Sequence, residues 1–165
     1  MSVRPVPLPE GALLQRYGQR PDCHTDCFET SVPGAVRLSD LIAAFYATRL
    51  FRLERWVLAR ALRRPITEAE LQALAAGDST AFAIWTVEAR EDREILLRER
   101  SGATRSYLAV ADAGGGTVLR FGSAVVPKDG AEIGRAYRVL MPLHLLYSRA
   151  LLAAAARRLK AGVAA

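Results

Sequence analysis

Lysine, cysteine and histidine are all scarce in this chain of 165 residues. Lysine and arginine together number 23, of which only Lys128 and Lys160 are lysines, and there are 2 cysteines and 2 histidines. A structural zinc site usually takes four ligands in closely spaced pairs, and His144 lies far along the chain from Cys23 and Cys27. In a strand, positions 23 and 27 lie about 13 Å apart, too far for a disulfide or a shared ion. We therefore predict no metal site, no disulfide and no cofactor.

Motifs of known catalytic chemistry are also missing. Ser123 does not lie in a Gly-x-Ser-x-Gly turn between a strand and a helix, as the nucleophile of a hydrolase would. The glycines at 114–116 precede a predicted strand, so no helix N-terminus follows them to hold a phosphate. A single histidine on an apolar stripe, such as His144, is typical of a hydrogen-bonded core residue. The motifs assign no catalytic residue, and the sequence favours a protein that is not an enzyme.

Long uninterrupted apolar segments are few. Residues 1–20 contain three prolines and lack the apolar core of a signal peptide, so we expect a cytoplasmic protein with reduced cysteines. The run 139–156 approaches membrane-spanning length, but it is interrupted by four residues, Pro142, His144, Ser148 and Arg149. A central arginine costs about 2.5 to 3.5 kcal/mol on insertion. We interpret the run as a buried helix and predict no transmembrane segment.

The formal net charge of +6 comes from arginine. An arginine-rich, alanine-rich composition is what a GC-rich bacterial genome produces, and its attraction for anions is screened within about 8 to 10 Å at physiological salt. One segment is especially basic and includes Arg49, Arg52, Arg55, Arg60, Arg63 and Arg64. Few aromatic residues are interleaved and Glu54 interrupts the series, so we interpret it as a solvated helix face and predict no nucleic-acid partner.

The pattern divides the chain into an irregular N-terminal arm, residues 1–21, and a single domain, residues 22–162. A first strand is predicted at 23–32, where a Pro-Gly turn ends it. Four further strands are predicted at 81–89, 94–100, 104–111 and 117–126. Turn signals separate these four, which favours an antiparallel meander.

Helical spacing fills the interval between the first and second strands. A helix begins after Ser39 or Asp40 and stops at Pro65, with a break near 48–51 that would divide it in two. A shorter helix follows, with a capping box of Thr67 and Glu70 and an end at Gly77. The fold class is therefore α+β, an antiparallel sheet of five to seven strands wrapped on a long C-terminal helix, with two or three helices after the first strand.

The C-terminal helix runs to about Lys160 and has one apolar stripe. We expect five of its residues to face the sheet, Leu140, Met141, His144, Leu151 and Leu152. Four arginines should reach solvent, Arg135, Arg138, Arg157 and Arg158. Pro142 lacks an amide hydrogen, so it should start the main helix or kink it.

Polar or bulky residues recur inside otherwise apolar elements, at positions where a plain core would use leucine or valine. Small-molecule pockets have this character, being mostly apolar with a few polar groups. The candidate ligand-binding residues are Trp85, Arg105, Tyr107, Phe121, Ser123, His144 and Ser148. For Arg105 and Tyr107 there is an alternative, because Ser106 and Leu108 alternate with them along the strand. If Ser106 and Leu108 face the core, Arg105 and Tyr107 face solvent.

Several short segments together form a recognisable set: Asp26-Cys27-Phe28, Ala44-Phe45-Tyr46, Leu53-Glu54-Arg55, Phe82-Ala83-Ile84-Trp85, Thr104-Arg105-Ser106-Tyr107-Leu108, Phe121-Gly122-Ser123-Ala124 and His144-Leu145-Leu146-Tyr147-Ser148. With the order of elements, they resemble the START-like, helix-grip (SRPBCC) superfamily, which includes polyketide cyclases, birch-allergen-like proteins and lipid-transfer domains, and more narrowly a bacterial branch of it. The resemblance implies a cavity between the sheet and the final helix that holds a hydrophobic molecule. The superfamily sheet usually has seven strands, whereas the pattern here shows five.

Three hypotheses follow. The first is a non-catalytic protein that binds a hydrophobic or amphipathic small molecule, with Arg105 or His144 meeting its polar end. The second is a cyclase- or dehydratase-like enzyme that uses His144 or Tyr107 as general acid or base. The third is an interaction protein that forms a homodimer and so buries the apolar surface assigned here to a pocket. The apolar width of residues 139–156, which exceeds one narrow stripe, favours it.

Overall fold

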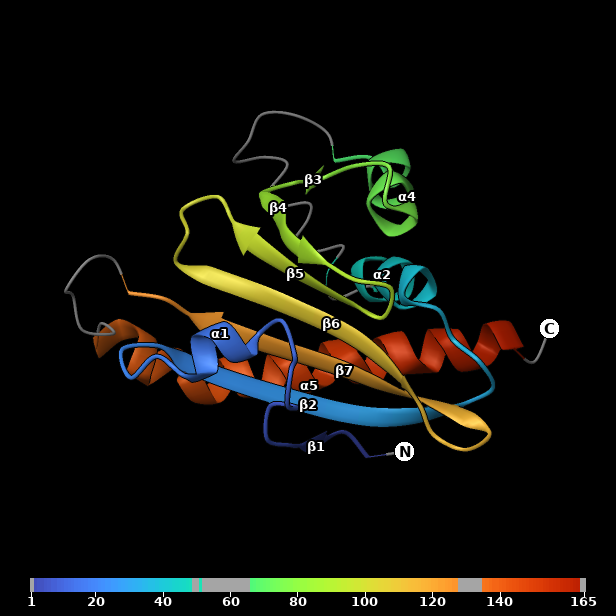
Figure 1. Cartoon of the computed structure of the whole chain (residues 1–165), viewed down its shortest axis with the longest axis horizontal. Helices are drawn as coiled ribbons and strands as arrows, with labels where there is room; N and C mark the ends of the chain where they lie inside the picture. The colour runs from blue at the N-terminus through green and yellow to red at the C-terminus, as the bar shows by residue number, and fades with distance from the viewer. Residues whose placement is uncertain (1, 49–50, 52–65, 128–134, 164–165) are drawn as a thin grey trace.

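The described part of the chain forms one seven-stranded antiparallel sheet, in the order β1-β2-β7-β6-β5-β4-β3 (Figure 1). The computed structural model describes residues 2–48, 51, 66–127 and 135–163, and only the backbone of 135–140 and 163. In chain order the elements are β1 (Arg4–Pro5), α1 (Gln15–Gly18), β2 (His24–Pro33), α2 (Leu38–Tyr46), α4 (Glu68–Ala76), β3 (Ala81–Phe82), β4 (Trp85–Arg90), β5 (Glu94–Glu99), β6 (Thr104–Asp112), β7 (Gly116–Val125) and α5 (Arg135–Val163). The predicted fold class is confirmed.

The long strands β2, β7 and β6 form the centre of the sheet. β2 pairs with β7 along its whole length, from His24 opposite Val125 to Pro33 opposite Gly116. Side chains alternate between the two faces, so Phe28 of β2 and Leu108 of β6 lie on the face covered by α2 and α5, which we call the helix face. The opposite face carries the N-terminal residues, and we call it the arm face.

Two short strands at the sheet edges account for the difference between the five strands of the sequence pattern and the seven observed. β1 pairs with β2 through only Arg4 and Pro5. β3 and β4 correspond to the single strand predicted at 81–89, which is broken by a two-residue turn at Ala83 and Ile84. Ala83 has φ of +55°, a conformation that is uncommon for a residue with a side chain. This turn places Trp85 at the first position of β4.

The shorter helices begin and end where local chemistry predicts. Thr67 accepts a hydrogen bond from the amide of Glu70, and the Glu70 carboxylate accepts one from the amide of Thr67, which is the predicted capping box of α4. Gly77 ends α4 with φ of +93°. In α2 the predicted N-cap is wrong by two residues or more, since Arg37 is the cap and the Asp40 carboxylate accepts from its amide.

Helix α5 is a continuous helix of 29 residues that contains Pro142. Leu151, Leu152, Ala155 and Ala156 are buried against the helix face of the sheet and α2. The run 139–156, which we interpreted as a buried helix, is buried on one side only, because Leu143 and Leu146 are 63% and 64% exposed. Arg157 and Arg158 are exposed as expected, whereas the side chains of Arg135, Arg138 and Leu140 lie outside the described residues, as do the arginines between 49 and 64.

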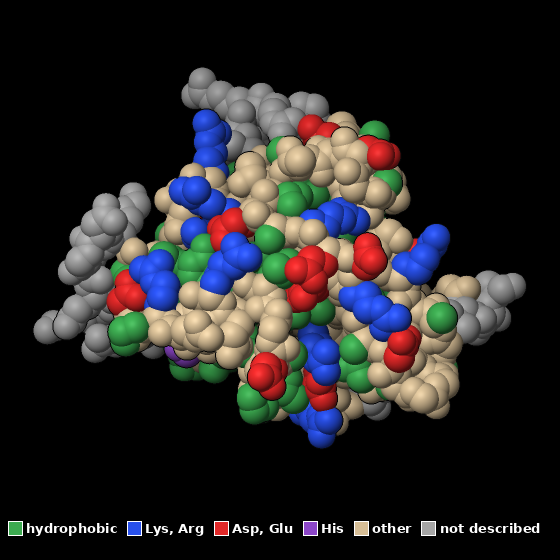
Figure 2. Space-filling model, viewed as in Figure 1, with side chains coloured by type: hydrophobic (Ala, Val, Ile, Leu, Met, Phe, Trp, Pro, Cys, Tyr) green, Lys and Arg blue, Asp and Glu red, His purple; other side chains and the backbone are tan. Residues whose placement is uncertain are grey.

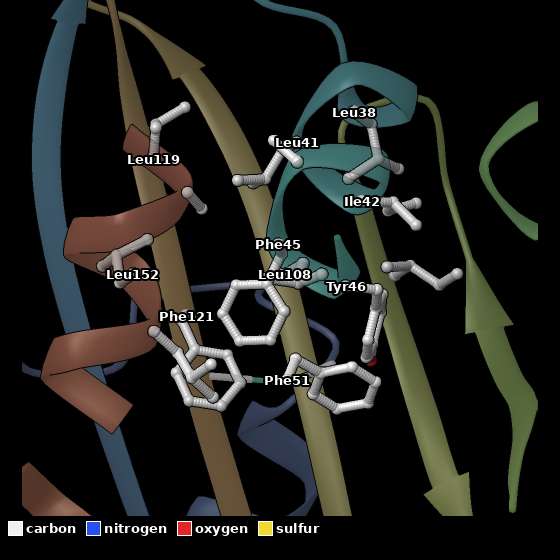
Figure 3. Packing of buried hydrophobic residues seen from close by; sticks show 14 of the residues in the cluster. Leu38, Leu41, Ile42, Phe45, Tyr46, Phe51, Leu108, Leu119, Phe121 and Leu152 are labelled. Atoms are coloured by element: carbon white, nitrogen blue, oxygen red, sulfur yellow. The ribbon is translucent and has the colours of Figure 1, made fainter. Parts of the chain in front are cut away.

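The core on the helix face is a single cluster of apolar side chains (Figure 3). Its centre is aromatic: the rings of Phe45 and Phe121 lie 4.7 Å apart between centroids, and those of Tyr46 and Phe51 also lie 4.7 Å apart. α2 contributes Leu41 beside these rings, and α5 contributes Leu152 from the other side (Figure 3). Aromatic rings at such separations add to the stabilisation from burial alone.

The N-terminal arm is ordered and covers part of the arm face. Leu14 is fully buried and Tyr17 nearly so, in a second cluster with Leu96, Tyr107 and other residues of the sheet. Gly122 allows this approach, because a Cβ there would lie 2.8 Å from Leu14 and 2.9 Å from the carbonyl oxygen of Asp26. Around the arm, basic and acidic side chains are interspersed over this face of the molecule (Figure 2).

Candidate functional site

A cavity of about 200 Å³ lies between the helix face of the sheet and α5, with Phe51 completing one wall. Its lining is mostly aromatic and aliphatic, and the polar side chains around it include Trp85, Ser106, Ser123, His144 and Ser148. The rings come from α2, β7 and α5, and they are those of Phe45, Tyr46, Phe121 and Tyr147. Lining of this composition is typical of sites that bind small organic molecules.

Three polar side chains meet at one end of this cavity. The hydroxyl of Ser123 donates a hydrogen bond to Asp26 Oδ2 over 2.8 Å. Nε2 of His144 lies 2.9 Å from Ser123 Oγ and 3.1 Å from Asp26 Oδ2. Ser123 is paired with Asp26 across β2 and β7, and His144 reaches both from α5. The sheet therefore fixes two of these groups, and the helix adds the third.

The arrangement differs from a nucleophilic triad. In a Ser-His-Asp triad the serine and the carboxylate meet opposite nitrogens of the imidazole, so that one can be deprotonated while the other holds the ring. Here both groups meet Nε2. The Ser123 hydroxyl donates its hydrogen to Asp26 and not to the imidazole, so the geometry does not hand the serine proton to His144. The cluster fixes the orientation of the imidazole without activating Ser123.

Two further polar atoms at the cavity lining have no hydrogen-bond partner. Trp85 Nε1 and Ser148 Oγ are both inaccessible to solvent, and neither has a hydrogen-bond partner among the residues that the structure describes. Ser148 as a whole is fully buried. Buried polar groups in proteins are nearly always paired, and one left unpaired costs about 1 to 3 kcal/mol. These atoms therefore mark positions where a bound molecule can complete the hydrogen bonding.

Six of the seven predicted ligand-binding residues border the cavity. Trp85, Phe121, Ser123, His144 and Ser148 do so with side chains on the helix face, and Arg105 borders it from β6.

The side chains of Arg105 and Tyr107 lie on the arm face, away from the cavity. Strand alternation predicted this face of the sheet correctly. The prediction that the two side chains face solvent is wrong, because beneath the arm Arg105 is only 7% exposed and Tyr107 only 2% exposed.

Arg105 is held by several contacts. Its Nε donates to Glu88 Oε2 over 2.7 Å and lies 2.9 Å from the Tyr17 hydroxyl, and Nη1 donates to the carbonyl oxygen of Gly102. Its guanidinium group also lies over the Tyr17 ring, 4.8 Å from the centroid.

Burial also removes Tyr107 from acid-base chemistry near neutral pH. Desolvation, with a smaller contribution from a hydrogen bond to Glu94, raises the pKa of Tyr107 far above its usual range. Burial and the hydrogen bond to Glu88 raise the pKa of Tyr17 as well. Both phenols stay protonated, so His144 is the one acid-base group of the second hypothesis that reaches the cavity.

Sequence reasoning missed Asp26 and the aromatic wall. Asp26 shares a face of β2 with Phe28 and Val32, so a carboxylate at an inward position of an alternating strand was the available signal. Phe45, Tyr46 and Phe51 read as ordinary core residues of a helix, and only their position opposite Trp85 and Phe121 makes them part of a cavity.

Two comparisons with known proteins found no match: no model of a known protein family matches the sequence, and no curated protein matches it. Across the described ranges, no helix combines the length and apolar character needed to cross a membrane. No cluster of three or more His, Cys, Asp or Glu side chains suited to a metal ion occurs in that part of the chain, and Cys23 and Cys27 are free thiols.

Proposed function

We propose that this protein binds a compact amphipathic small molecule in the cavity between the sheet and α5, as a member of the START-like, helix-grip superfamily. The observation that carries the proposal is the combination of an aromatic, largely apolar lining with two buried polar atoms, Trp85 Nε1 and Ser148 Oγ, that have no partner. A cavity that served packing alone would be filled by side chains, and its polar atoms would be paired.

The size of the cavity limits the ligand. Drug-sized molecules occupy sites of roughly 300 to 1,000 Å³, whereas the described residues bound about 200 Å³. Sterols and long lipids, which the superfamily resemblance would suggest, are larger than this volume allows. The ligand that fits best is a small molecule of one or two rings.

The polar end of the ligand is assigned to His144, Ser123 and Ser148. Arg105 is not available for this role, because its guanidinium group is committed to Glu88, Tyr17 and Gly102 on the other face of the sheet. His144 is 29% exposed along its side chain, and Asp26 and Ser123 hold its ring in place. A small molecule can therefore reach a hydrogen-bonding site that is already oriented, which lowers the entropy lost on binding.

The test is mass spectrometry of an organic extract from the purified protein, together with displacement of a fluorescent hydrophobic probe. Ser123→Leu should fill the cavity and abolish probe binding. Ser31→Leu is the matched control, since Ser31 is an exposed residue of the paired strand β2. Melting curves of both variants check that they fold. Absence of any co-purified molecule, with no probe binding to the wild-type chain, contradicts the proposal.

A second candidate is the cyclase- or dehydratase-like enzyme, which the position of His144 favours. Asp26 orients the imidazole at the cavity, and an oriented histidine can move a proton at the carbon next to a carbonyl group. Exchange of deuterium from heavy water into a small ketone, followed by NMR, measures this reaction. A rate equal to that of the His144→Gln variant would exclude the candidate and leave binding as the function.

A further inference from the structure

Two unpaired polar atoms approach the cavity from opposite sides. Trp85 stands at the start of β4, which β5 and β6 separate from β7 in the sheet. Ser148 lies on α5, which packs over β2 and β7. The aromatic side chains Phe45, Tyr46 and Phe121 line the space between them. A ligand that satisfied both atoms would lie across the cavity with its apolar body against these rings.

The chemistry of the two atoms differs. The indole N–H of tryptophan only donates a hydrogen bond, whereas a serine hydroxyl can donate or accept. The group that meets Trp85 must therefore be an acceptor, and the group that meets Ser148 is not restricted in the same way. Trp85 sets the stricter condition on the ligand.

Formal charge sets a second condition. Two of the residues that border the cavity have side chains that can be positive, Arg105 and His144. The Arg105 guanidinium group lies on the arm face in contact with Glu88, and His144 already faces the Asp26 carboxylate. Among the described residues that line the cavity, no cation is therefore left for an anionic ligand. A buried carboxylate without a cationic partner is strongly disfavoured.

We infer that the ligand is a small uncharged molecule with an unsaturated or aromatic body, and that it carries a carbonyl-type acceptor oxygen that is bound by Trp85 Nε1. This inference rests on the proposed function, because it specifies what the same cavity selects. Trp85 and Ser148 are then the residues that determine specificity, and the aromatic wall supplies most of the affinity.

Three probes of nearly equal size separate the contributions of the acceptor oxygen, the apolar body and the charge to affinity. Acetophenone has the acceptor oxygen, cumene lacks it, and benzoate is charged. The sequence contains 2 tryptophans, so a Trp56→Phe background leaves Trp85 as the only tryptophan, which can be excited selectively over the tyrosines. Affinities come from calorimetry or ligand-observed NMR, and fluorescence in that background reports contact at Trp85. Melting curves verify the fold of each variant.

We expect Trp85→Phe to lower the ratio of acetophenone affinity to cumene affinity by roughly tenfold, the effect of pairing a buried donor. Any cavity created by the smaller ring affects both probes alike, so the ratio isolates the hydrogen bond. Ser148→Ala is the second variant and should lower the same ratio less. Benzoate should bind at least about a hundredfold more weakly than acetophenone.

The outcomes distinguish this inference from the proposed function on which it rests. If neither acetophenone nor cumene binds the wild-type protein, the proposed function fails. If both bind and the ratio stays unchanged in Trp85→Phe, the cavity binds small molecules but the acceptor inference is wrong, and water is the partner of Trp85. If benzoate binds as tightly as acetophenone, the ligand is not restricted to uncharged molecules.

Discussion

Arg105 links three segments on the arm face of the sheet. From β6 it contacts Tyr17 of α1 and Glu88 of β4. The pairing of β4 with β5 shifts by one residue between Val87 and Ala89, and this bulge lets the Glu88 side chain turn toward Arg105. Arg105→Ala would leave the mostly buried Glu88 with only the more distant cation of Arg16, whose Nη1 lies 3.7 Å from Glu88 Oε1. We expect a loss of about 2 to 3 kcal/mol in the free energy of unfolding, measured by urea denaturation.

The matched control is Arg98→Ala. Arg98 lies directly opposite Arg105 in the β5–β6 register but is exposed, so its removal should change stability by less than about 0.5 kcal/mol. Equal losses from the two variants would mean that the buried contacts of Arg105 contribute nothing beyond its charge.

The thiol of Cys27 makes stability depend on pH in the alkaline range. Burial raises the pKa of Cys27 from its ordinary 9.0 to about 12. Between these values the folded chain holds a proton that the unfolded chain has lost, so stability falls as pH rises through this window and is unaffected by this group below it. The slope from one thiol is at most about 1.4 kcal/mol per pH unit.

Cys27→Ala should therefore flatten the decline in melting temperature between pH 9 and pH 11. Cys23→Ala is the control, since Cys23 is only half-buried and its pKa is raised less. Tyr17 and Tyr107, whose pKa values burial also raises, contribute to the same decline. The slopes of the variants are therefore compared with one another and not with a slope of zero. An identical pH profile for wild type and Cys27→Ala would show that this thiol is not desolvated in solution.

At the residue scale, alternation in the sequence separated the two faces of each strand but did not say what covers them. Ser106 and Leu108 were assigned to one face of β6 and Arg105 and Tyr107 to the other, as observed. Coverage of the second face by residues 12–17 of the arm depends on a contact between segments far apart in sequence, which no local pattern reports.

At the scale of elements, α5 is the part of the fold most sensitive to rotation about its axis. Leu152 is fully buried, whereas Arg158 is exposed near the C-terminus. Leu152→Asp would place an unpaired carboxylate in the core and should unfold the domain, while Arg158→Asp should leave the melting temperature nearly unchanged. Circular dichroism melting curves measure both. Similar melting shifts from the two substitutions would contradict the orientation of α5 and with it the positions of His144 and Ser148.

Most elements were predicted to within a residue or two because their signals are local. The capping box at Thr67, the glycine at 77 and the turn residues between strands act on their immediate neighbours. The edge strand β1 was not predicted, and β3 was predicted only as part of one strand with β4, since two residues are too few to display alternation. Their strand conformation comes from pairing with β2 and β4, and the cavity likewise depends on side chains that meet only in the folded chain.

At the scale of the whole molecule, the arm holds its place chiefly through Leu14. Its side chain is fully buried where Gly122 leaves room for it. Leu14→Ala should cost about 2 to 5 kcal/mol. If the arm detaches before the domain unfolds, trypsin should cut after Arg16 at temperatures below the melting transition, whereas Pro21 protects the bond after Arg20. Leu13→Ala, at the neighbouring half-buried position, is the control, and equal protease resistance of both variants would show that the arm is held by other contacts.

Self-association is the third hypothesis from the sequence, and α5 offers the surface for it. Leu143 and Leu146 are three residues apart on the helix and both are largely exposed. If they pair two chains, light scattering at micromolar concentration should give twice the mass of one chain. The double variant Leu143→Glu, Leu146→Glu should then give the mass of one chain. A wild-type mass equal to one chain would exclude the homodimer.

The pairing of β2 with β7 also determines when the protein can assemble during its synthesis. β2 ends at residue 33, but its partner strand begins only at residue 116, and α5 follows still later. Segments that leave the ribosome early must therefore wait for most of the chain before they find their neighbours, and such distant contacts form slowly. Because α5 closes the cavity, a small molecule can bind only the completed chain. It can stabilise the finished protein, but it cannot guide the earlier steps of folding.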